Sequence, residues 1–164
     1  MLTLNETGTL HVIAQVAIAL IGFTGIVISL GERARDNWTA EVKLRLYTML
    51  YPSMTALFCS FVPLILVYFI TNIETCWRLS NGILGLAHAI NLAGFLRGSK
   101  VAHITRTQKL NALFGGCVVL THFLAAFAIL PWQEAIFLFG LLQQLYIGFH
   151  NFILLFKPGE KSSG

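Results

Sequence analysis

Long stretches without charged residues alternate with short polar segments along the whole chain. Asp, Glu, Lys and Arg are absent from 10–30, 46–70, 79–96, 110–130 and 135–156, and every stretch has at least 18 residues. At ~1.5 Å per residue, such lengths suffice or nearly suffice to cross a hydrocarbon layer ~30 Å thick. The pattern predicts one transmembrane domain over 1–164, with helices at about 10–30, 46–70, 77–96, 110–130 and 133–156.

The composition is that of an all-α polytopic membrane protein. Hydrophobic residues make up 56% of the chain and charged residues 11%, and the mean hydropathy is +0.74. We expect the first helix to be retained, because no Lys or Arg precedes it as in a signal peptide. The three cysteines are odd in number and form no CxxC pair, which indicates neither a disulfide framework nor a thiolate zinc site.

The basic residues predict the orientation of the helices. Ten of the eleven lie in the segments that follow the first, third and fifth predicted helices. By the positive-inside rule these segments are cytoplasmic, so the N-terminus lies outside and the C-terminus in the cytoplasm. The first two segments contain the candidate docking or lipid-facing residues, which are Arg33, Arg35, Lys43, Arg45, Arg97, Lys100, Arg106 and Lys109. Charges divided among short loops favour anionic lipid head groups, and not nucleic acid, as the partner.

Polar and small residues fall on one side of each predicted helix. In the first helix Gln15, Gly22 and Ser29 are seven residues apart, with Ala19 and Gly25 close to the same line. The last three helices supply a candidate polar path of His88, Asn91, His122, Gln143, Gln144, His150 and Asn151. Such stripes serve either close helix packing in lipid or a hydrated path, and both interpretations stay open.

Two of the histidines are predicted at one depth. His88 lies ~16 Å from the outer end of its helix and His122 ~18 Å from the inner end of its own, whereas His150 lies nearer the cytoplasm. The pair could relay protons or form hydrogen bonds between packed helices.

The pair could also ligate a metal or haem, with Gly85, Gly115 and Gly116 making room for a flat macrocycle. Two imidazoles leave a four-coordinate metal site half complete, and no intramembrane Asp or Glu completes it. We therefore predict no metal site and no resident cofactor, and keep haem as an alternative.

Charged residues at the predicted outer face form a candidate vestibule. Glu74 and Arg78 are four residues apart, in the favourable order for an ion pair on a helix surface. Glu134 is expected at the same face, and the acidic balance of the three would favour cations.

Local signals predict details of the loops and of the second helix. Asn37 is the expected N-cap of an amphipathic lead-in to this helix, with Trp38 as an interfacial anchor. Pro52 and Pro63 predict kinks, and Pro131 predicts a tight outer turn.

The first half of the chain resembles small multi-pass bacterial inner-membrane proteins of unknown function. The resemblance rests on four segments, IGFTGIVISLGERARDNW, LRLYTMLYPS, FVPLIL and CWRLSNG, through Gly22, Phe23, Gly25, Gly31, Arg33, Trp38, Arg45, Leu46, Ser53, Pro63, Trp77, Arg78 and Ser80. It implies a bacterial inner-membrane location and no activity, cofactor or catalytic residue.

No catalytic motif for nucleotide, ester or peptide hydrolysis is present, so we predict that the protein is not an enzyme. The leading hypothesis is a small homo-oligomeric, channel-like or transport-related protein that conducts protons or small cations. An alternative is a non-transporting anchor or partner subunit that docks another protein through its basic cytoplasmic loops. A third hypothesis is a haem-binding redox protein.

Overall fold

The computed structural model describes residues 4–30 and 38–156, and this part of the chain is all-α. Its helices are α1 (Leu4–Leu30), α2 (Ala40–Leu66), α3 (Ile73–Gly98), α4 (Arg106–Ala126) and α5 (Gln133–Phe156). All five are long and apolar enough to cross a membrane. The prediction of five membrane-spanning helices is confirmed on these terms.

The observed helix ends differ from the predicted ones most at α2. This helix begins at Ala40 instead of 46 and ends at Leu66 instead of 70. The prediction started after the last charged residue, yet helices extend into the head-group region, where Lys43 and Arg45 remain solvated or paired. Thr39 is the N-cap and accepts a hydrogen bond from Val42 N at 3.4 Å.

The prediction of Asn37 as the N-cap was therefore wrong, and Asn37 itself lies outside the described residues. Helix α1 also begins six residues earlier than predicted, at Leu4 instead of 10. The fourth helix ends at Ala126 instead of 130, and Pro131 lies in the turn before α5, as predicted. Pro52 and Pro63 both lie inside α2, and the kinks expected there stay a prediction.

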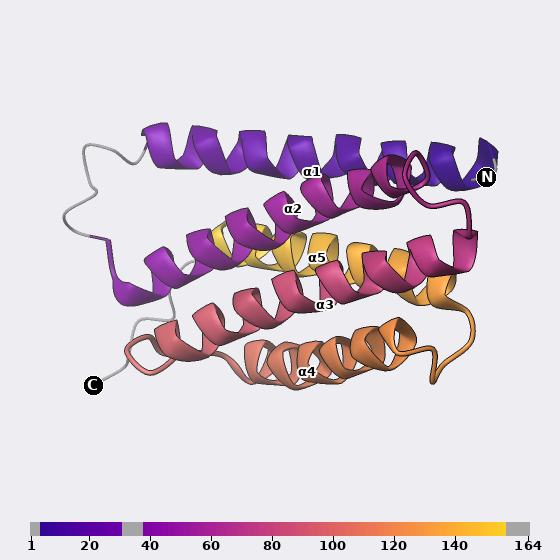
Figure 1. Ribbon diagram of the computed structural model, residues 1–164. Helices are drawn as coiled ribbons and strands as arrows, with labels where there is room; N and C mark the ends of the chain where they lie inside the picture. Colours follow the sequence, from indigo (N-terminus) through magenta and orange to yellow (C-terminus); the bar gives the residue numbers. More distant parts are fainter. Residues whose placement is uncertain (1–3, 31–37, 157–164) are drawn as a thin grey trace.

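The helices run antiparallel, so that α1 begins and α5 ends at opposite ends of the bundle (Figure 1). We call the end where α1, α3 and α5 begin the outer end, and the other the inner end, after the predicted orientation. In the described part of the chain α5 contacts all four other helices, whereas α4 contacts only α3 and α5. Helices α2 to α5 therefore surround a common centre, and α1 lies outside it against α2 and α5.

Apolar side chains fill the bundle mainly in its outer half. Trp77 of α3 and Phe137 of α5 pack there with ring centroids 5.6 Å apart. The surrounding core consists of Leu10, Ile13, Ala17, Leu20, Ala56, Cys59, Leu84, Leu141 and Leu145. A smaller cluster of Leu44, Phe95 and Ala102 closes the inner end. Between these two clusters the centre of the bundle is polar.

Two arginines bind the last carbonyls of neighbouring helices. Arg45 Nη1 donates to Leu154 O of α5 at 2.7 Å, and Arg78 Nε donates to Ala126 O of α4 at 3.3 Å. The last carbonyls of a helix have no hydrogen-bond donor within the helix, and they carry negative partial charge. A guanidinium supplies both the missing donor and a compensating positive charge.

This use of the guanidinium groups corrects two predictions. Arg78 forms no ion pair with Glu74 in the described structure, because its Nε is directed to α4. Arg45 belongs to the packing of α2 against α5 and not to a docking loop.

Replacing Arg45 by Met is expected to destabilise the protein by about 1.5–3 kcal/mol, because the change removes a charge-assisted hydrogen bond from the α5 carbonyl. Lys43→Met is the matched control, since Lys43 is exposed and lies two residues earlier in the same helix. Thermal unfolding in detergent, followed by helical circular dichroism, measures both. Equal melting temperatures for the two variants would contradict the role given to Arg45.

Candidate functional site

Helices α3, α4 and α5 meet around His122, which is fully buried in the middle of the bundle. Its Nδ1 lies 2.9 Å from Asn81 Oδ1. Asn81 Nδ2 donates to Trp77 O at 2.9 Å and to Gln133 O at 2.7 Å. These two carbonyls fix the orientation of the amide, so Asn81 Oδ1 must accept a hydrogen bond. Neutral His122 therefore carries its proton on Nδ1, which leaves the lone pair on Nε2.

Glycines on the neighbouring helices make the space for this imidazole. A Cβ atom at Gly140 of α5 would collide with the Nε2 side of His122. A Cβ atom at Gly85 of α3 would lie 2.9 Å from His122 Cβ, closer than side chains normally pack. Only glycine at both positions lets α4 approach α3 and α5 closely enough for the bond between His122 and Asn81.

His88 lies beside His122. Their ring centroids are 6.2 Å apart, with the planes at 60°. His88 is 2% exposed, and its Nε2 lies 3.4 Å from the position that a Cβ of Gly115 would take. Gln143 Nε2 approaches the same position to 3.6 Å, so the missing side chain of Gly115 lets both polar groups lie against the backbone of α4.

Polar contacts continue from His88 toward the inner end. Asn91 Nδ2 donates to Thr55 Oγ1 at 2.8 Å and lies 3.4 Å from Gln144 Oε1. Two helical turns further along α5, Gln108 Nε2 donates to Asn151 Oδ1 at 3.2 Å. The buried polar side chains therefore extend along the bundle, and we call them the polar axis: Gln108, Asn151, Gln144, Asn91, Gln143, His88, His122 and Asn81.

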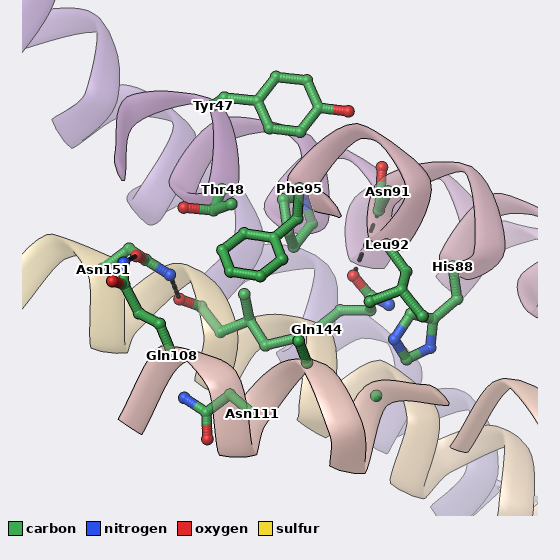
Figure 2. A pocket seen from close by; sticks show the side chains of 14 residues that line it. Tyr47, Thr48, His88, Asn91, Leu92, Phe95, Gln108, Asn111, Gln144 and Asn151 are labelled. Atoms are coloured by element: carbon green, nitrogen blue, oxygen red, sulfur yellow. Dashed lines mark hydrogen bonds between the residues drawn. The ribbon is translucent and has the colours of Figure 1, made fainter. Parts of the chain in front are cut away.

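A cavity of about 50 Å³ lies along the inner half of the polar axis (Figure 2). It is large enough for a few water molecules, each of which needs about 10–15 Å³ by the same measure. Its polar walls include Thr48, Asn111 and Gln144, and Pro52, Leu92 and Phe95 form much of its apolar wall. His88 and Asn151 lie at opposite ends of the cavity (Figure 2).

Several buried atoms of the polar axis have no hydrogen-bond partner among the described residues. They are His88 Nδ1, His122 Nε2, Gln143 Oε1 and Gln144 Nε2. Buried polar atoms nearly always find a partner, because an unsatisfied one costs about 1–3 kcal/mol. Four such atoms within two neighbouring turns are more than the packing of helices requires, and they indicate a site for water or another small hydrogen-bonding species.

The structure brings together most of the predicted polar path. His150 is the exception, because it is half-buried and stacks on the exposed Tyr146 at 5.9 Å. The prediction did not include Thr55, Asn81 and Gln108, which complete the contacts. The helical spacing does place Thr55 and Asn81 on the polar stripes of their helices, although the candidate path left them out. Gln108 was missed because it falls before the charge-free stretch of α4.

The described side chains offer little support for a metal or haem. No group of three or more His, Cys, Asp or Glu side chains that could hold a metal ion occurs within 4–30 and 38–156. Small-molecule sites usually have about 300–1,000 Å³, far more than the cavity beside His88. Gly85 and Gly115 were expected to make room for a macrocycle. The space beside Gly85 is instead taken by His122, and the space beside Gly115 by His88.

The three residues of the predicted vestibule share the outer end, but the charges are not arranged as expected. Glu74 is exposed, while Arg78 is bound to the end of α4. Glu134 of α5 shares a side-chain hydrogen bond with Glu6 of α1. The open groove at this end is lined instead by Thr7, His11, Leu64, Val67, Tyr68, Ile70, Thr71 and Ile73, without a carboxylate.

At the inner end, Lys43, Arg97, Lys100, Arg106 and Lys109 are all exposed. Arg33 and Arg35 lie outside the described residues. The loop between α3 and α4 is held to α2, because Glu41 Oε1 accepts a hydrogen bond from His103 N at 3.0 Å. The exposed cations therefore lie on a fixed surface of the bundle.

No protein-family model, curated protein or solved structure matches this chain. The apolar helices define an integral membrane protein. Its bacterial inner-membrane location stays a prediction from the sequence resemblance.

Gly140→Ala is expected to displace the His122 ring and to destabilise the protein by about 1–3 kcal/mol, as other overpacked cores are destabilised. Gly116→Ala is the matched control on the opposite helix, because its new methyl group would meet only Leu92 Cδ2, at 3.9 Å. Thermal unfolding of both variants in the same detergent tests the difference. A melting temperature of Gly140→Ala that equals that of Gly116→Ala would refute the proposed packing.

Proposed function

We propose that this protein is a transport-related integral membrane protein that conducts protons along its polar axis. The observation that carries the proposal is the row of buried polar side chains in the centre of α2 to α5, with the His88–His122 pair in its middle. Ionisable side chains at membrane depth usually mark ion or proton pathways, because burying them without a role is costly.

The chemistry of the two imidazoles suits proton transfer. His122 holds its Nδ1 proton toward Asn81 and keeps a lone pair on Nε2. A proton can bind at Nε2 to form the imidazolium, but the Asn81 amide cannot carry the Nδ1 proton onward. Release of that proton therefore requires the ring to rotate, so that Nδ1 faces a water molecule, which takes the proton and leaves the ring neutral. A tautomer exchange or ring rotation then restores the starting state.

Transfer between the two rings requires a bridge. A direct hydrogen bond of about 2.9 Å between ring nitrogens would bring the centroids to about 5 Å, whereas they are 6.2 Å apart. One water molecule between the rings supplies the missing link, and the adjoining cavity has the volume to deliver it.

The lining of the cavity favours protons over metal cations. Its polar groups are carboxamides, hydroxyls and one imidazole, and no Asp or Glu is among them. Hard cations such as Mg²⁺ and Ca²⁺ bind through carboxylates, which also offset their charge. A metal ion here would lose its hydration shell without a compensating negative charge.

One copy of the chain contains the complete polar axis, so conduction does not require a pore between copies. The expectation that several copies surround a path came from the small size of the chain. Because α2 to α5 direct their polar stripes inward, the proposed proton path lies within one copy and does not depend on the oligomeric state.

The exposed basic inner end supports a second candidate function, a membrane anchor or partner subunit. Lys43, Arg97, Lys100, Arg106 and Lys109 are free to bind an acidic protein surface or anionic lipids. This role needs none of the buried histidines, so the two functions can be separated by variants of His88 and His122.

Proteoliposomes that contain a pH-sensitive dye, with a potassium gradient and valinomycin as the driving force, test the proton path. Wild-type protein should accelerate acidification, and His88→Gln and His122→Gln should each slow it about tenfold or more. At position 122, glutamine keeps a hydrogen-bond donor for Asn81. At either position it cannot gain and lose a proton near neutral pH. His103→Gln is the matched control, because His103 is exposed in the inner loop.

Verified insertion and unchanged helical content are required of every variant. Wild-type flux equal to that of protein-free liposomes, or equal flux in wild type and both buried variants, would exclude the proton path. Normal cellular function of the double histidine variant, lost on reversing Arg97 and Arg106, would favour the docking function.

A further inference from the structure

The polar stripe of α1 faces away from the rest of the protein. Leu10, Ile13, Ala17 and Leu20 of this helix are buried against the bundle. The residues of the predicted stripe are all exposed, namely Gln15, Ala19, Gly22, Gly25 and Ser29, and so is Gly8, two turns before Gln15. In α2 to α5 the corresponding stripes face the centre, so α1 is the exception.

Gln15 is placed where the bilayer offers it no partner. It lies eleven residues after Leu4, ~16 Å along a helix that begins at one membrane face, and therefore close to the midplane. It forms no hydrogen bond with any described residue. A carboxamide exposed to hydrocarbon is costly, because lipid tails neither donate nor accept hydrogen bonds.

The backbone beside Gln15 is open to close approach by another helix. A Cβ atom at Gly8, Gly22 or Gly25 would meet nothing within 4 Å. Gly8, Gln15, Gly22 and Ser29 repeat at intervals of seven residues, which is the spacing of a seam between two helices that cross at about 20°. Small residues along such a seam allow membrane helices to pack backbone to backbone.

We propose that α1 forms a homodimer with α1 of a second copy across the seam of Gly8, Gln15, Gly22 and Ser29. All copies insert with the same orientation, so a twofold axis along the membrane normal places Gln15 opposite Gln15 of the partner subunit. A carboxamide is both donor and acceptor, and two of them satisfy each other. A different protein would have to offer a matching amide at this depth, whereas a second copy always does.

This interface goes beyond the proposed function and does not depend on it. Helix α1 contributes no residue to the cavity or to the polar axis. A failure of proton conduction would leave the dimer untouched, and a monomeric protein could still conduct protons.

Cysteine cross-linking of the full chain in liposomes locates the interface. Cys117 is exposed on α4 and is first replaced by Ala, whereas Cys59 and Cys76 are buried. Ala19→Cys and Gly22→Cys should form disulfide-linked dimers several-fold more efficiently than Val16→Cys or Leu86→Cys. Val16 and Leu86 are exposed controls on another side of α1 and on α3. The glycine variant is expected to fold, since its new side chain enters open space.

Energy transfer between fluorescently labelled copies, measured over a range of protein-to-lipid ratios, tests the role of Gln15. Gln15→Leu should weaken the dimer about tenfold, as expected for loss of a hydrogen bond between membrane helices. Val16→Leu, the matched control, should leave the dissociation constant unchanged.

Monomeric protein at all ratios would overturn the proposal, as would equal cross-linking at all four positions. Preferential cross-linking at Leu86→Cys would place the interface elsewhere and would also overturn it. The same holds if Gly22→Cys in native membranes links only to a different polypeptide, or if Gln15→Leu associates as tightly as wild type.

Discussion

The hydrocarbon core of the bilayer supplies no hydrogen-bond partner, so every polar group that enters it must find one within the protein. This constraint explains the arrangement of α2 to α5. Asn81 binds His122, Gln108 binds Asn151, and Arg45 binds a terminal carbonyl of α5. Each contact joins two helices, so the polar residues that lipid excludes also hold the bundle together. Of the residues of the polar axis that have atoms without a described partner, His88 and Gln144 line a cavity large enough for a few water molecules.

Glycine allows these large polar side chains to lie between closely packed helices. Gly140 faces the ring of His122, and Gly94 faces the hydroxyl group of Tyr47. The Cβ position of Gly148 lies 2.7 Å from Ser53 Oγ. In each case a side chain of the neighbouring helix fills the space that a side chain at the glycine position would occupy. The glycine and the polar residue therefore act as a pair, and neither position can change alone without moving the helix.

Hydropathy and charge predicted the helices, because crossing the bilayer requires a fixed length of apolar chain. The rise per residue also predicted that His88 and His122 lie close together, and their ring centroids are 6.2 Å apart. Helix periodicity gave the polar side of each helix but could not say what that side faces, because the direction depends on which helices are neighbours. The stripes with His88 and His122 therefore turned out to face the centre, whereas that with Gln15 faces lipid. Charge alone also misplaced Arg45 and Arg78, whose partners are carbonyls distant in sequence.

The central claim is that the polar stripes of α2 to α5 enclose a hydrated centre that opens toward the inner end. The most direct measurement uses cysteines introduced one at a time into a protein in which the exposed Cys117 has been replaced. It follows their reaction with a small water-soluble thiol reagent that is added from the inner side. Ile147→Cys lines the cavity and should react readily, whereas Leu142→Cys, which is 53% exposed on the outer surface of α5, should remain protected by lipid. An unreactive Ile147→Cys, or equal reaction at both positions, would contradict a hydrated centre.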